Sequence, residues 1–319
     1  MGETTRMSIV FMGTPDFAVA SLDAIIKAGI QVKAVVTAPD KPAGRGHKLQ
    51  QSAVKQYAVQ AGIPVLQPEK LRSEAFLDEL MSVQADLFVV VAFRMLPKVV
   101  WDMPPNGTIN LHASLLPDYR GAAPINWAII NGEQTTGATT FFIREEIDTG
   151  DIIDKTEVEI HENMTAGELH DVLMEKGATL LVETIHAIFN GTATSIPQDE
   201  HKNRAIHEAP KLNKENTRID WNRPASELVD LIHGLSPWPG AWCYMNMEDS
   251  QQRFKIYRCR KMAHDGLPAG TLRLGRGEVL VGTGSGSIKL EEVQRQGKPR
   301  MSATDFANGL SGTDFIQLS

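Results

Sequence analysis

The chain has 319 residues, of which 42% are hydrophobic, and its formal net charge is −7. Single hydrophobic cores seldom grow beyond about 250–300 residues, so this length predicts two domains. The acidic balance argues against a protein that coats nucleic acid with its whole surface. The charge is uneven, because residues 1–207 hold 17 basic against 26 acidic residues, whereas residues 208–319 hold 15 against 13. The two halves are therefore expected to have different partners.

The sequence also indicates the cellular compartment. It has no run of 18 apolar residues, and its first six residues lack the apolar core of a signal peptide. We therefore expect a cytoplasmic protein without a membrane segment. Cys243 and Cys259 have no His or Cys partner at a metal-ligand spacing, so neither a zinc site nor a disulfide framework is expected. Nothing in the sequence requires more than a monomer.

The first half of the chain alternates apolar runs with segments of helical periodicity. The apolar runs occupy residues 9–12, 32–38, 87–92, 108–111 and 139–143. Helical spacing occurs at residues 17–28, 52–61 and 73–81, and a long helix is expected from 165 to 189, before Asn190-Gly191. Continuous rather than alternating apolar runs indicate a parallel sheet that helices cover on both faces. We predict a doubly wound, mostly parallel, Rossmann-like α/β domain over residues 1–204.

The second half has a different pattern. Residues 197–223 are polar with few apolar anchors, which is typical of a linker and places a boundary near residue 205. A helical stretch at 225–235 precedes five short apolar segments, at 241–245, 254–258, 270–274, 278–282 and 287–293. Glycine-containing turns between them favour a small β-barrel of oligonucleotide-binding type, although a sandwich gives the same pattern. We predict that residues 205–319 form this domain, including the linker.

Polar side chains mark the end of the fourth apolar run. Asn110 and His112 lie two positions apart there, so both leave the same face of the predicted strand. Asp148 follows the next apolar run, in the turn Asp148-Thr149-Gly150. In open α/β sheets ligands bind beyond the carboxyl ends of the strands, where loops can bring Asp148 to His112. Each residue alone has a simple structural explanation as a cap or a turn, but together they predict a catalytic site.

Three motifs, in this order, resemble the signature of the folate-dependent formyltransferases. They are Asn-Leu-His-Ala-Ser-Leu-Leu-Pro at 110–117, Tyr-Arg-Gly-Ala-Ala-Pro-Ile at 119–125 and Asp-Thr-Gly at 148–150. The segments at 13–18, 39–49 and 238–240 narrow the resemblance to the branch of that family that acts on methionyl-tRNA. It covers nearly the whole chain. It implies transfer of a formyl group from 10-formyltetrahydrofolate to the amino group of methionyl initiator tRNA.

The chemistry of this transfer explains the residue types. Attack of an amine on the formyl carbon passes through a tetrahedral oxyanion, to which Asn110 can donate an amide N–H. A cationic His112 can donate as well, and a nearby carboxylate such as Asp148 favours that charged form. The released proton can leave through water held by Asp148. We expect these three residues to be catalytic, and the reaction demands no metal.

The resemblance also implies a folate site. The pterin is expected beside the segment that follows the third apolar run, and the folate tail beside the loop after His112. The residues implied are Phe93, Arg94, Met95, Leu96, Ser114, Leu115, Leu116, Pro117, Ile143 and Ile147. Residues 93–96 are shorter than the matching segment in many members of the methionyl-tRNA branch and look closer to the glycinamide ribonucleotide formyltransferases.

Basic residues mark candidate tRNA contacts. A glycine-containing basic loop follows residue 40, and the end of one predicted barrel strand carries three cations. The predicted tRNA-binding residues are Lys41, Arg45, Lys48, Lys211, Arg258, Arg260 and Lys261, with Lys214 and Arg218 as further candidates in the linker. A solvated loop has the same composition, and only the resemblance favours a binding role.

Other functions use the same catalytic residues. The formyl acceptor could be glycinamide ribonucleotide, an amino-sugar nucleotide or water. The second domain argues against the first of these, and the loop at 42–46 argues against the second. A non-catalytic RNA-binding protein is a further alternative, against which the intact Asn110, His112 and Asp148 argue. No Gly-x-Gly-x-x-Gly motif is present, so a dehydrogenase is not expected.

Overall fold

The computed structural model describes residues 7–43, 48–198, 206–247, 250–263, 266–275, 278–310 and 314–319. They form two compact units. The first contains the residues up to Gly121, then Gly137–Val158 and Asp171–Glu208; the second contains Ala122–Thr136, Glu159–His170 and Ala209–Ser319. Two short segments from within residues 1–204 thus belong to the second unit.

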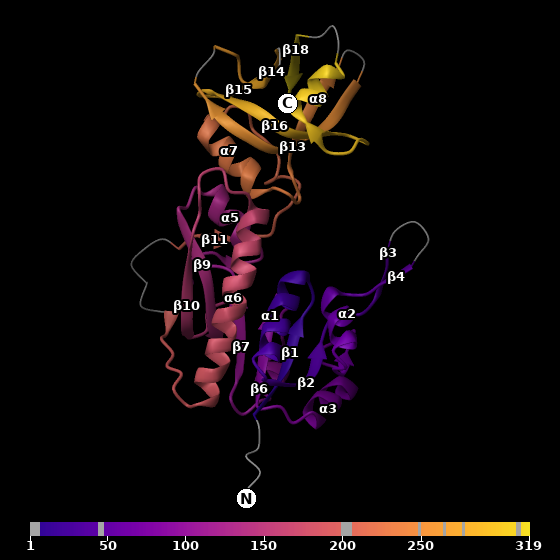
Figure 1. Cartoon of the computed structure of the whole chain (residues 1–319), viewed down its shortest axis with the longest axis vertical. Helices are drawn as coiled ribbons and strands as arrows, with labels where there is room; N and C mark the ends of the chain where they lie inside the picture. The colour runs from indigo at the N-terminus through magenta and orange to yellow at the C-terminus, as the bar shows by residue number, and fades with distance from the viewer. Residues whose placement is uncertain are drawn as a thin grey trace, which may run out of the picture. The chain divides into compact units, whose positions relative to one another are not determined.

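A seven-stranded sheet forms the centre of the first unit. Its strands are β1 (Ser8–Gly13), β2 (Gln31–Val36), β5 (Val65–Leu66), β6 (Leu87–Val91), β7 (Thr108–His112), β9 (Thr135–Phe142) and β10 (Ile152–Glu159). They lie in the order β10-β9-β7-β6-β1-β2-β5 (Figure 1). The strands from β7 to β5 are parallel, and β9 is antiparallel to β7. The predicted mostly parallel sheet is confirmed, with two unforeseen strands: β5, which has only two residues, and β10, whose largely exposed residues have no continuous apolar run.

Helices cover both faces of this sheet. They are α1 (Asp16–Lys27), α2 (Ala53–Gln60), α3 (Glu74–Ser82), α4 (Lys98–Trp101) and α6 (Ala166–Phe189). On one face, Val10 and Met12 of β1 share a hydrophobic cluster with Phe76 and Leu80 of α3. The other residues of β1 point to the opposite face, where α1 contacts β1 and β6. The doubly wound arrangement follows, because strands that are apolar on both sides must be covered on both sides.

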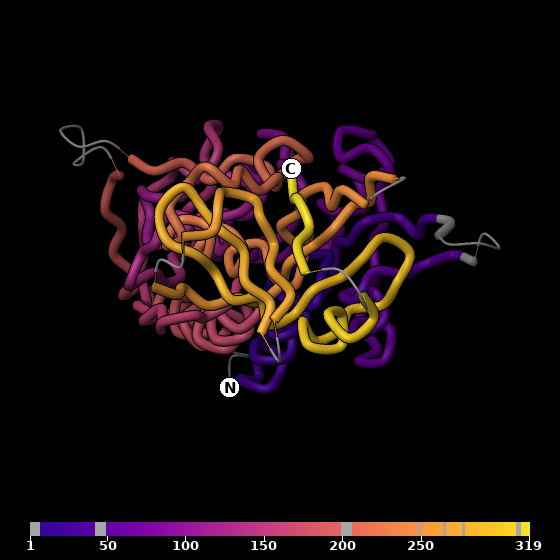
Figure 2. Tube along the Cα trace, turned by 90° about the horizontal axis from the view of Figure 1, so that it is seen from above, coloured from indigo at the N-terminus to yellow at the C-terminus, as the bar shows by residue number. Residues whose placement is uncertain are grey.

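A closed antiparallel barrel forms the centre of the second unit. Its elements are α5 (Pro124–Ile130), α7 (Ala225–Gly234), β12 (Ala241–Met247), β13 (Ser250–Met262), β14 (Thr271–Leu274), β15 (Val279–Gly282), β16 (Ser287–Arg295), β17 (Met301–Ser302), α8 (Ala303–Asn308) and β18 (Phe315–Leu318). The barrel order is β13-β12-β18-β14-β15-β16, and pairing of β16 with β13 closes it. Figure 2 draws these strands in orange and yellow. The predicted barrel is confirmed, and β18 at the end of the chain supplies a sixth strand that the sequence did not indicate.

Alternate residues of the barrel strands fill its core. Cys243, Phe254 and Cys259 are fully buried there, and both cysteines are free. Ile219 and Trp221 also lie in this core, although they come from the polar segment that the sequence predicts as a linker. A segment with few apolar residues can therefore still anchor to a domain through two large ones.

Two small sheets complete the described structure. β3 (Lys41–Ala43) and β4 (Lys48–Gln50) form an antiparallel hairpin, and β8 (Arg120–Gly121) pairs with β11 (Glu208–Ala209). Within the ranges given above, no helix combines the length and the apolar character that a bilayer crossing needs.

Substitution of Phe254 tests the barrel core. Phe254 is fully buried, and its ring centroid lies 5.0 Å from that of Phe306. Phe254→Ala removes this packing and should lower the free energy of unfolding by about 3–5 kcal/mol. Denaturant unfolding followed by tryptophan fluorescence measures the loss. Phe315→Ala is the matched control, because Phe315 is 57% exposed, and equal losses in both variants would contradict the assignment of this core.

Candidate active site

The carboxyl end of β7 presents the two polar residues that the sequence singles out. β7 lies between β6 and β9, and Asn110 is opposite Val90 and Phe141 in these strands. His112 is buried, whereas Asn110 is half-buried. Within the described part of the chain, the Asn110 amide has no hydrogen-bond partner. It is therefore available to a ligand at the end of the strand.

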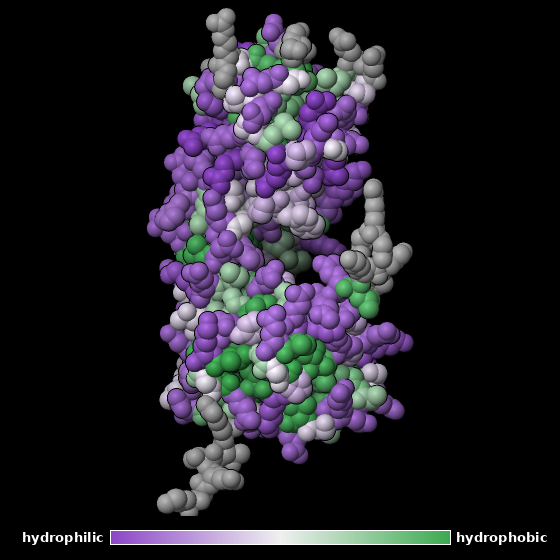
Figure 3. Space-filling model, turned by 45° about the vertical axis from the view of Figure 1, so that its right-hand side comes forward, coloured by the Kyte–Doolittle hydropathy of each residue, from purple (hydrophilic) through white to green (hydrophobic). Residues whose placement is uncertain are grey.

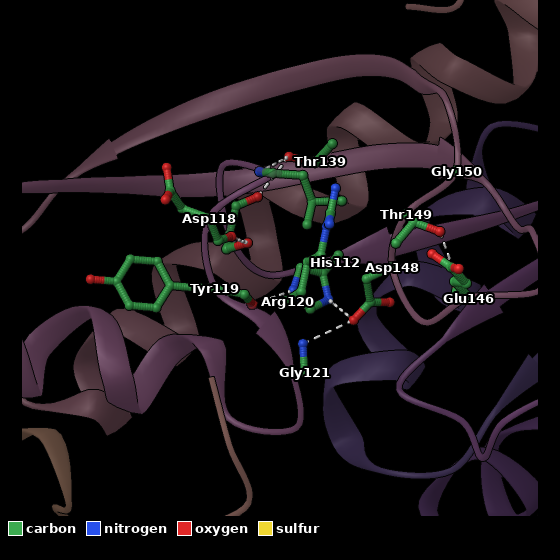
Figure 4. A network of polar contacts seen from close by, with 12 residues as sticks. His112, Asp118, Tyr119, Arg120, Gly121, Thr139, Glu146, Asp148, Thr149 and Gly150 are labelled. Carbon is green, nitrogen blue, oxygen red and sulfur yellow. Dashed lines mark hydrogen bonds and ion pairs between the residues drawn. The ribbon is translucent and has the colours of Figure 1, made fainter. Parts of the chain in front are cut away.

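One backbone carbonyl orients the His112 ring. The Nε2 atom of His112 lies 2.8 Å from the carbonyl oxygen of Tyr119. A carbonyl can only accept a hydrogen bond, so Nε2 carries the hydrogen and donates it. The other nitrogen, Nδ1, lies 3.7 Å from Oδ2 of Asp148 (Figure 4). Only Nδ1 is left for a substrate, and it is on the side of the carboxylate.

The loop between β9 and β10 brings Asp148 to this position. Oδ2 of Asp148 accepts a hydrogen bond of 3.0 Å from the backbone N–H of Gly121, 27 residues earlier in the chain. Asp148 has a φ of 55°, in the left-handed region. Such a conformation costs about 1–3 kcal/mol for a residue other than glycine. The surrounding structure must therefore hold the loop in this conformation.

Gln198 provides that support. Its Nε2 donates to the carbonyl oxygens of Asp148 and Gly150, at 3.0 and 2.6 Å. Its Oε1 accepts from Nε and Nη2 of Arg120, at 3.1 and 2.6 Å. The side chain is buried, so these bonds are shielded from water. Gln198 thus joins the loop that carries Asp148 to the segment that carries Gly121.

Gly150 ends this loop where a side chain has no room. A Cβ there would lie 1.6 Å from the carbonyl oxygen of Phe142, the last residue of β9. The glycine of the Asp148-Thr149-Gly150 motif is therefore needed for the return of the chain past β9.

The loop after His112 is fixed by several hydrogen bonds of its own (Figure 4). Thr139 of β9 donates to the carbonyl of Ser114 at 2.6 Å. Tyr119 also has a positive φ, of 60°, and its hydroxyl lies 3.1 Å from Nδ1 of His207. These contacts hold the Tyr119 carbonyl in place, and through it the His112 ring.

The residues expected to bind folate fall into two groups. Phe93, Leu96 and Ile143 pack against one hydrophobic cluster beside β6, at the same edge of the sheet as His112. Met95 and Ile147 are 68% and 56% exposed. On the face drawn in Figure 3, hydrophilic residues dominate and hydrophobic ones gather in patches. The structure thus brings part of the expected set together at the carboxyl edge.

Arg94 and the loop after His112 have internal contacts instead. The Arg94 guanidinium donates to the carbonyls of Pro68 and Glu69, and burial lowers its pKa. Ser114 and Leu116 are fully buried, and Pro117 is also buried, while Leu115 is half-buried. A ligand beside this loop would therefore meet backbone groups and Leu115 rather than the other side chains.

The predicted tRNA-binding residues are dispersed. Lys41 is exposed on the β3–β4 hairpin, whereas Arg45 and the side chain of Lys48 lie outside the described residues. Lys211 and Lys261 are exposed. Arg258 forms an ion pair of 2.6 Å with Glu168, and Arg260 forms one of 2.6 Å with Glu291. The charges of Arg258 and Arg260 are thus already partly neutralised.

Sequence reasoning missed the supports of the site. Gly121, Tyr119 and Arg120 lie in a motif that the resemblance quotes without a role, and Gln198 lies in the segment predicted as linker. No periodicity or spacing could have identified them, because each acts through a contact across many residues. Over the ranges listed under Overall fold, no group of three or more His, Cys, Asp or Glu residues is arranged to hold a metal ion.

The fold and this constellation define the class of protein. The model of the formyl transferase family matches residues 6–185, and that of the formyl transferase C-terminal domain matches residues 211–311. The chain therefore belongs to the formyl transferase family.

The chain is also similar to individual proteins over nearly its whole length. The chain is 51% identical to a methionyl-tRNA formyltransferase of Parabacteroides distasonis, over 95% of both chains. It is 50% identical to a methionyl-tRNA formyltransferase of Flavobacterium johnsoniae, over 97% of this chain and 98% of that one. Among solved structures, an N-formyltransferase from Helicobacter canadensis, in complex with folinic acid and dTDP-3-aminofucose, matches with a TM-score of 0.66. It is 22% identical and covers 89% of this chain and 98% of that one, which shows the shared fold.

Substitution of Gln198 tests the support of Asp148. Gln198→Ala removes the hydrogen bonds to the Asp148 loop, so Asp148 can leave its left-handed conformation. Because displacement of a catalytic group by about 1 Å can cost roughly 100-fold in rate, we expect kcat for formyl transfer to fall by about 10–100-fold. Steady-state kinetics measures this. Gln56→Ala is the control, because Gln56 is exposed and forms one long bond of 3.4 Å; unchanged kcat in both variants would refute the support by Gln198.

Proposed function

We propose that this chain transfers the formyl group of 10-formyltetrahydrofolate to the amino group of methionyl initiator tRNA, a step of translation initiation. One observation carries the proposal. At the carboxyl edge of the sheet, the free Asn110 amide stands two residues from a His112 ring whose remaining nitrogen lies 3.7 Å from Asp148. The full-length similarity to methionyl-tRNA formyltransferases supports the choice of acceptor.

Asn110 and His112 stabilise the tetrahedral intermediate. The α-amino group of methionine attacks the formyl carbon, and negative charge develops on the formyl oxygen. Asn110 donates to this oxygen with an amide that no other described group occupies. His112 contributes through Nδ1–H, because Nε2–H is engaged with the Tyr119 carbonyl. A preorganised donor of this kind is worth about 3–4 kcal/mol in other acyl transfers.

Asp148 serves as the charge partner of His112 and as the acceptor of the released proton. The attacking amine needs no serine or cysteine to activate it, since an α-amino group has a reference pKa of about 7.7–8.0 and is partly neutral at working pH. On attack its nitrogen becomes cationic and loses a proton to the Asp148 carboxylate through water. Collapse of the intermediate breaks the bond from carbon to N10, and this nitrogen receives a proton from the same pair of residues.

The two parts of the chain have different roles in the reaction. Residues 1–204 carry the chemistry and bind folate near Phe93, Leu96 and Ile143, and residues 205–319 bind the tRNA. The hairpin around Lys41 is a second tRNA contact. The base of this hairpin is anchored by Asp40, which pairs with Lys55 at 2.6 Å and accepts from Gln67 at 2.8 Å. We place the reaction in the cytoplasm and expect a monomer.

The direct test is transfer of labelled formyl from 10-formyltetrahydrofolate. Methionyl initiator tRNA, uncharged tRNA, glycinamide ribonucleotide and an amino-sugar nucleotide are the parallel acceptors, and free formate is measured alongside. We expect label on the charged tRNA alone. Label on another acceptor, or its loss as formate, would disprove this substrate while leaving the catalytic unit in place.

Asn110→Asp tests the oxyanion donor. The aspartate has the same size but, when ionised, can only accept hydrogen bonds and repels the developing charge. We expect kcat to fall by at least about 100–1,000-fold, with little change in the KM for tRNA. Asn106→Asp is the matched control, because Asn106 precedes β7 at the opposite end of the strand. Normal turnover in a folded Asn110→Asp enzyme would exclude Asn110 as the donor.

Asp148→Asn tests the charge beside His112. Asparagine also tolerates the left-handed conformation, so the change removes the carboxylate without adding backbone strain. We expect kcat for formyl transfer to fall by about 100-fold or more. Steady-state formylation of methionyl initiator tRNA measures this loss. Near-normal turnover would mean that Asp148 is not the proton acceptor.

A further inference from the structure

One short stretch of backbone carries a contact to each residue of the catalytic His–Asp pair. It consists of Tyr119 and the strand β8 that follows it. The Tyr119 carbonyl accepts from Nε2 of His112, and the Gly121 N–H donates to the carboxylate of Asp148. Whatever fixes this stretch of backbone therefore fixes both catalytic side chains.

The same backbone is hydrogen-bonded to the segment in which the chain passes from the first unit to the second for the last time. This segment comprises residues 207–210 and includes β11, which pairs with β8. The N–H groups of Ala122 and Ala123 both donate to the carbonyl of Ala209, at 2.8 and 3.3 Å. Ala209 is fully buried, so these bonds are shielded from water. We call residues 207–210 the β11 segment.

His207 attaches the β11 segment to Tyr119 in two ways. The Tyr119 N–H donates to the His207 carbonyl at 2.6 Å, and the Tyr119 hydroxyl lies 3.1 Å from Nδ1 of the His207 ring. The N–H of His207 donates to Oδ1 of Asp118 at 3.2 Å. The Tyr119 ring is buried and points away from His112 (Figure 4). The ring of Tyr119 thus anchors this residue to the β11 segment, while its carbonyl orients the catalytic ring.

Helix α5 holds the other end of the β11 segment. Nε1 of the Trp127 indole donates to the Pro210 carbonyl at 2.7 Å. α5 itself is fixed within the second unit, because the Asn126 amide donates to the Gly234 carbonyl at 2.7 Å and Ile130 lies in the barrel core. The β11 segment is therefore attached at both of its ends, to Tyr119 and to α5.

Tyr119 depends on this support because its backbone conformation is unfavourable. Its φ of 60° lies in the left-handed region, which a bulky residue seldom adopts. Such a conformation persists only when the surrounding structure imposes it. If Tyr119 relaxed, its carbonyl would turn away from His112. A shift of about 1 Å in a catalytic group can reduce a rate roughly 100-fold, so small changes in the β11 segment should alter turnover.

We propose that the β11 segment is a positioning element of the active site, with His207 and Trp127 as its positioning residues. By holding the backbone from Tyr119 to Ala123, it aligns Nδ1 of His112 with the carboxylate of Asp148. Although its sequence is that of a linker, loosening it should lower turnover rather than the affinity for either substrate. The proposal rests on the proposed function for the reaction in which turnover is measured.

His207→Ala tests the proposal in the full-length protein. His207 is exposed, so its replacement leaves the core intact. We expect kcat for formyl transfer to methionyl initiator tRNA to fall by about 5–20-fold, while KM for tRNA and for folate stays within about twofold of the wild type. His207→Asn should retain most of the turnover, because its amide can replace Nδ1 as the partner of the Tyr119 hydroxyl. Trp127→Phe, which keeps a ring but loses the N–H, should lower kcat in the same way as His207→Ala.

Proton–nitrogen NMR of histidine-labelled protein reports on His112 directly. The hydrogen on Nε2 is bonded to the Tyr119 carbonyl, so in the wild type it should exchange slowly with water and give a sharp signal. His112→Gln assigns this signal by removing it. His207→Ala should broaden or abolish the signal, whereas His207→Asn should preserve it. The measurement needs no substrate.

His186→Ala is the matched control. His186 is also an exposed histidine of the first unit, in the last turn of α6. Its replacement should leave kcat and the His112 signal unchanged. Tyr119→Phe removes the same hydroxyl contact from the other side, so His207→Ala should cost little more in that background.

Three results would overturn the proposal. One is an unchanged kcat in both His207→Ala and Trp127→Phe. Another is a higher KM for tRNA with unchanged kcat, which would make the β11 segment a tRNA contact instead. A third is a loss of kcat with an intact His112 signal, because the segment would then act on another part of the site. If the wild type fails to formylate methionyl-tRNA, the proposed function fails, yet the His112 signal still tests the β11 segment.

Discussion

The hydrogen bond from His112 Nε2 to the Tyr119 carbonyl is the contact on which the site depends. It requires a hydrogen on Nε2, because a carbonyl accepts and never donates, and it directs Nδ1 towards Asp148. It also requires the loop after β7 to hold Tyr119 in a left-handed conformation, which the contact with His207 stabilises. A single backbone oxygen thereby determines which ring nitrogen meets the substrate.

Asp148 shows how such a site tolerates strain. Its left-handed backbone costs about 1–3 kcal/mol. The Gly121 N–H bonds the Asp148 carboxylate, and such a bond to a charged group contributes about 1.5–3 kcal/mol. Two further bonds from Gln198 add roughly 0.5–1.5 kcal/mol each. The favourable contacts are similar in size to the strain or larger, so the carboxylate is preorganised before any substrate binds.

The barrel uses its cations in two ways. Arg258 and Arg260 pair with glutamates, and exposed pairs of this kind contribute little to stability, about 0–1 kcal/mol. Arg253 and Arg218 lie on aromatic rings instead, which restricts their motion without cancelling their charge. Whether a basic residue is free to bind an anion therefore depends more on the side chain next to it than on the number of basic residues in the segment.

The sequence by itself determined the elements and the chemistry. Continuous apolar runs indicated the parallel sheet, glycine-separated short strands indicated the barrel, and the spacing of Asn110 and His112 placed both on one face, because these patterns are local and follow the periods of strand and helix. Only the tertiary structure determined which distant residues hold the catalytic groups in place. Gln198 reaches Asp148 across 50 residues and Arg120 across 78, and Arg253 and Arg218 meet over one indole ring. Such contacts arise when the sheet and the barrel close, and no repeat or spacing along the chain encodes which distant partners then meet.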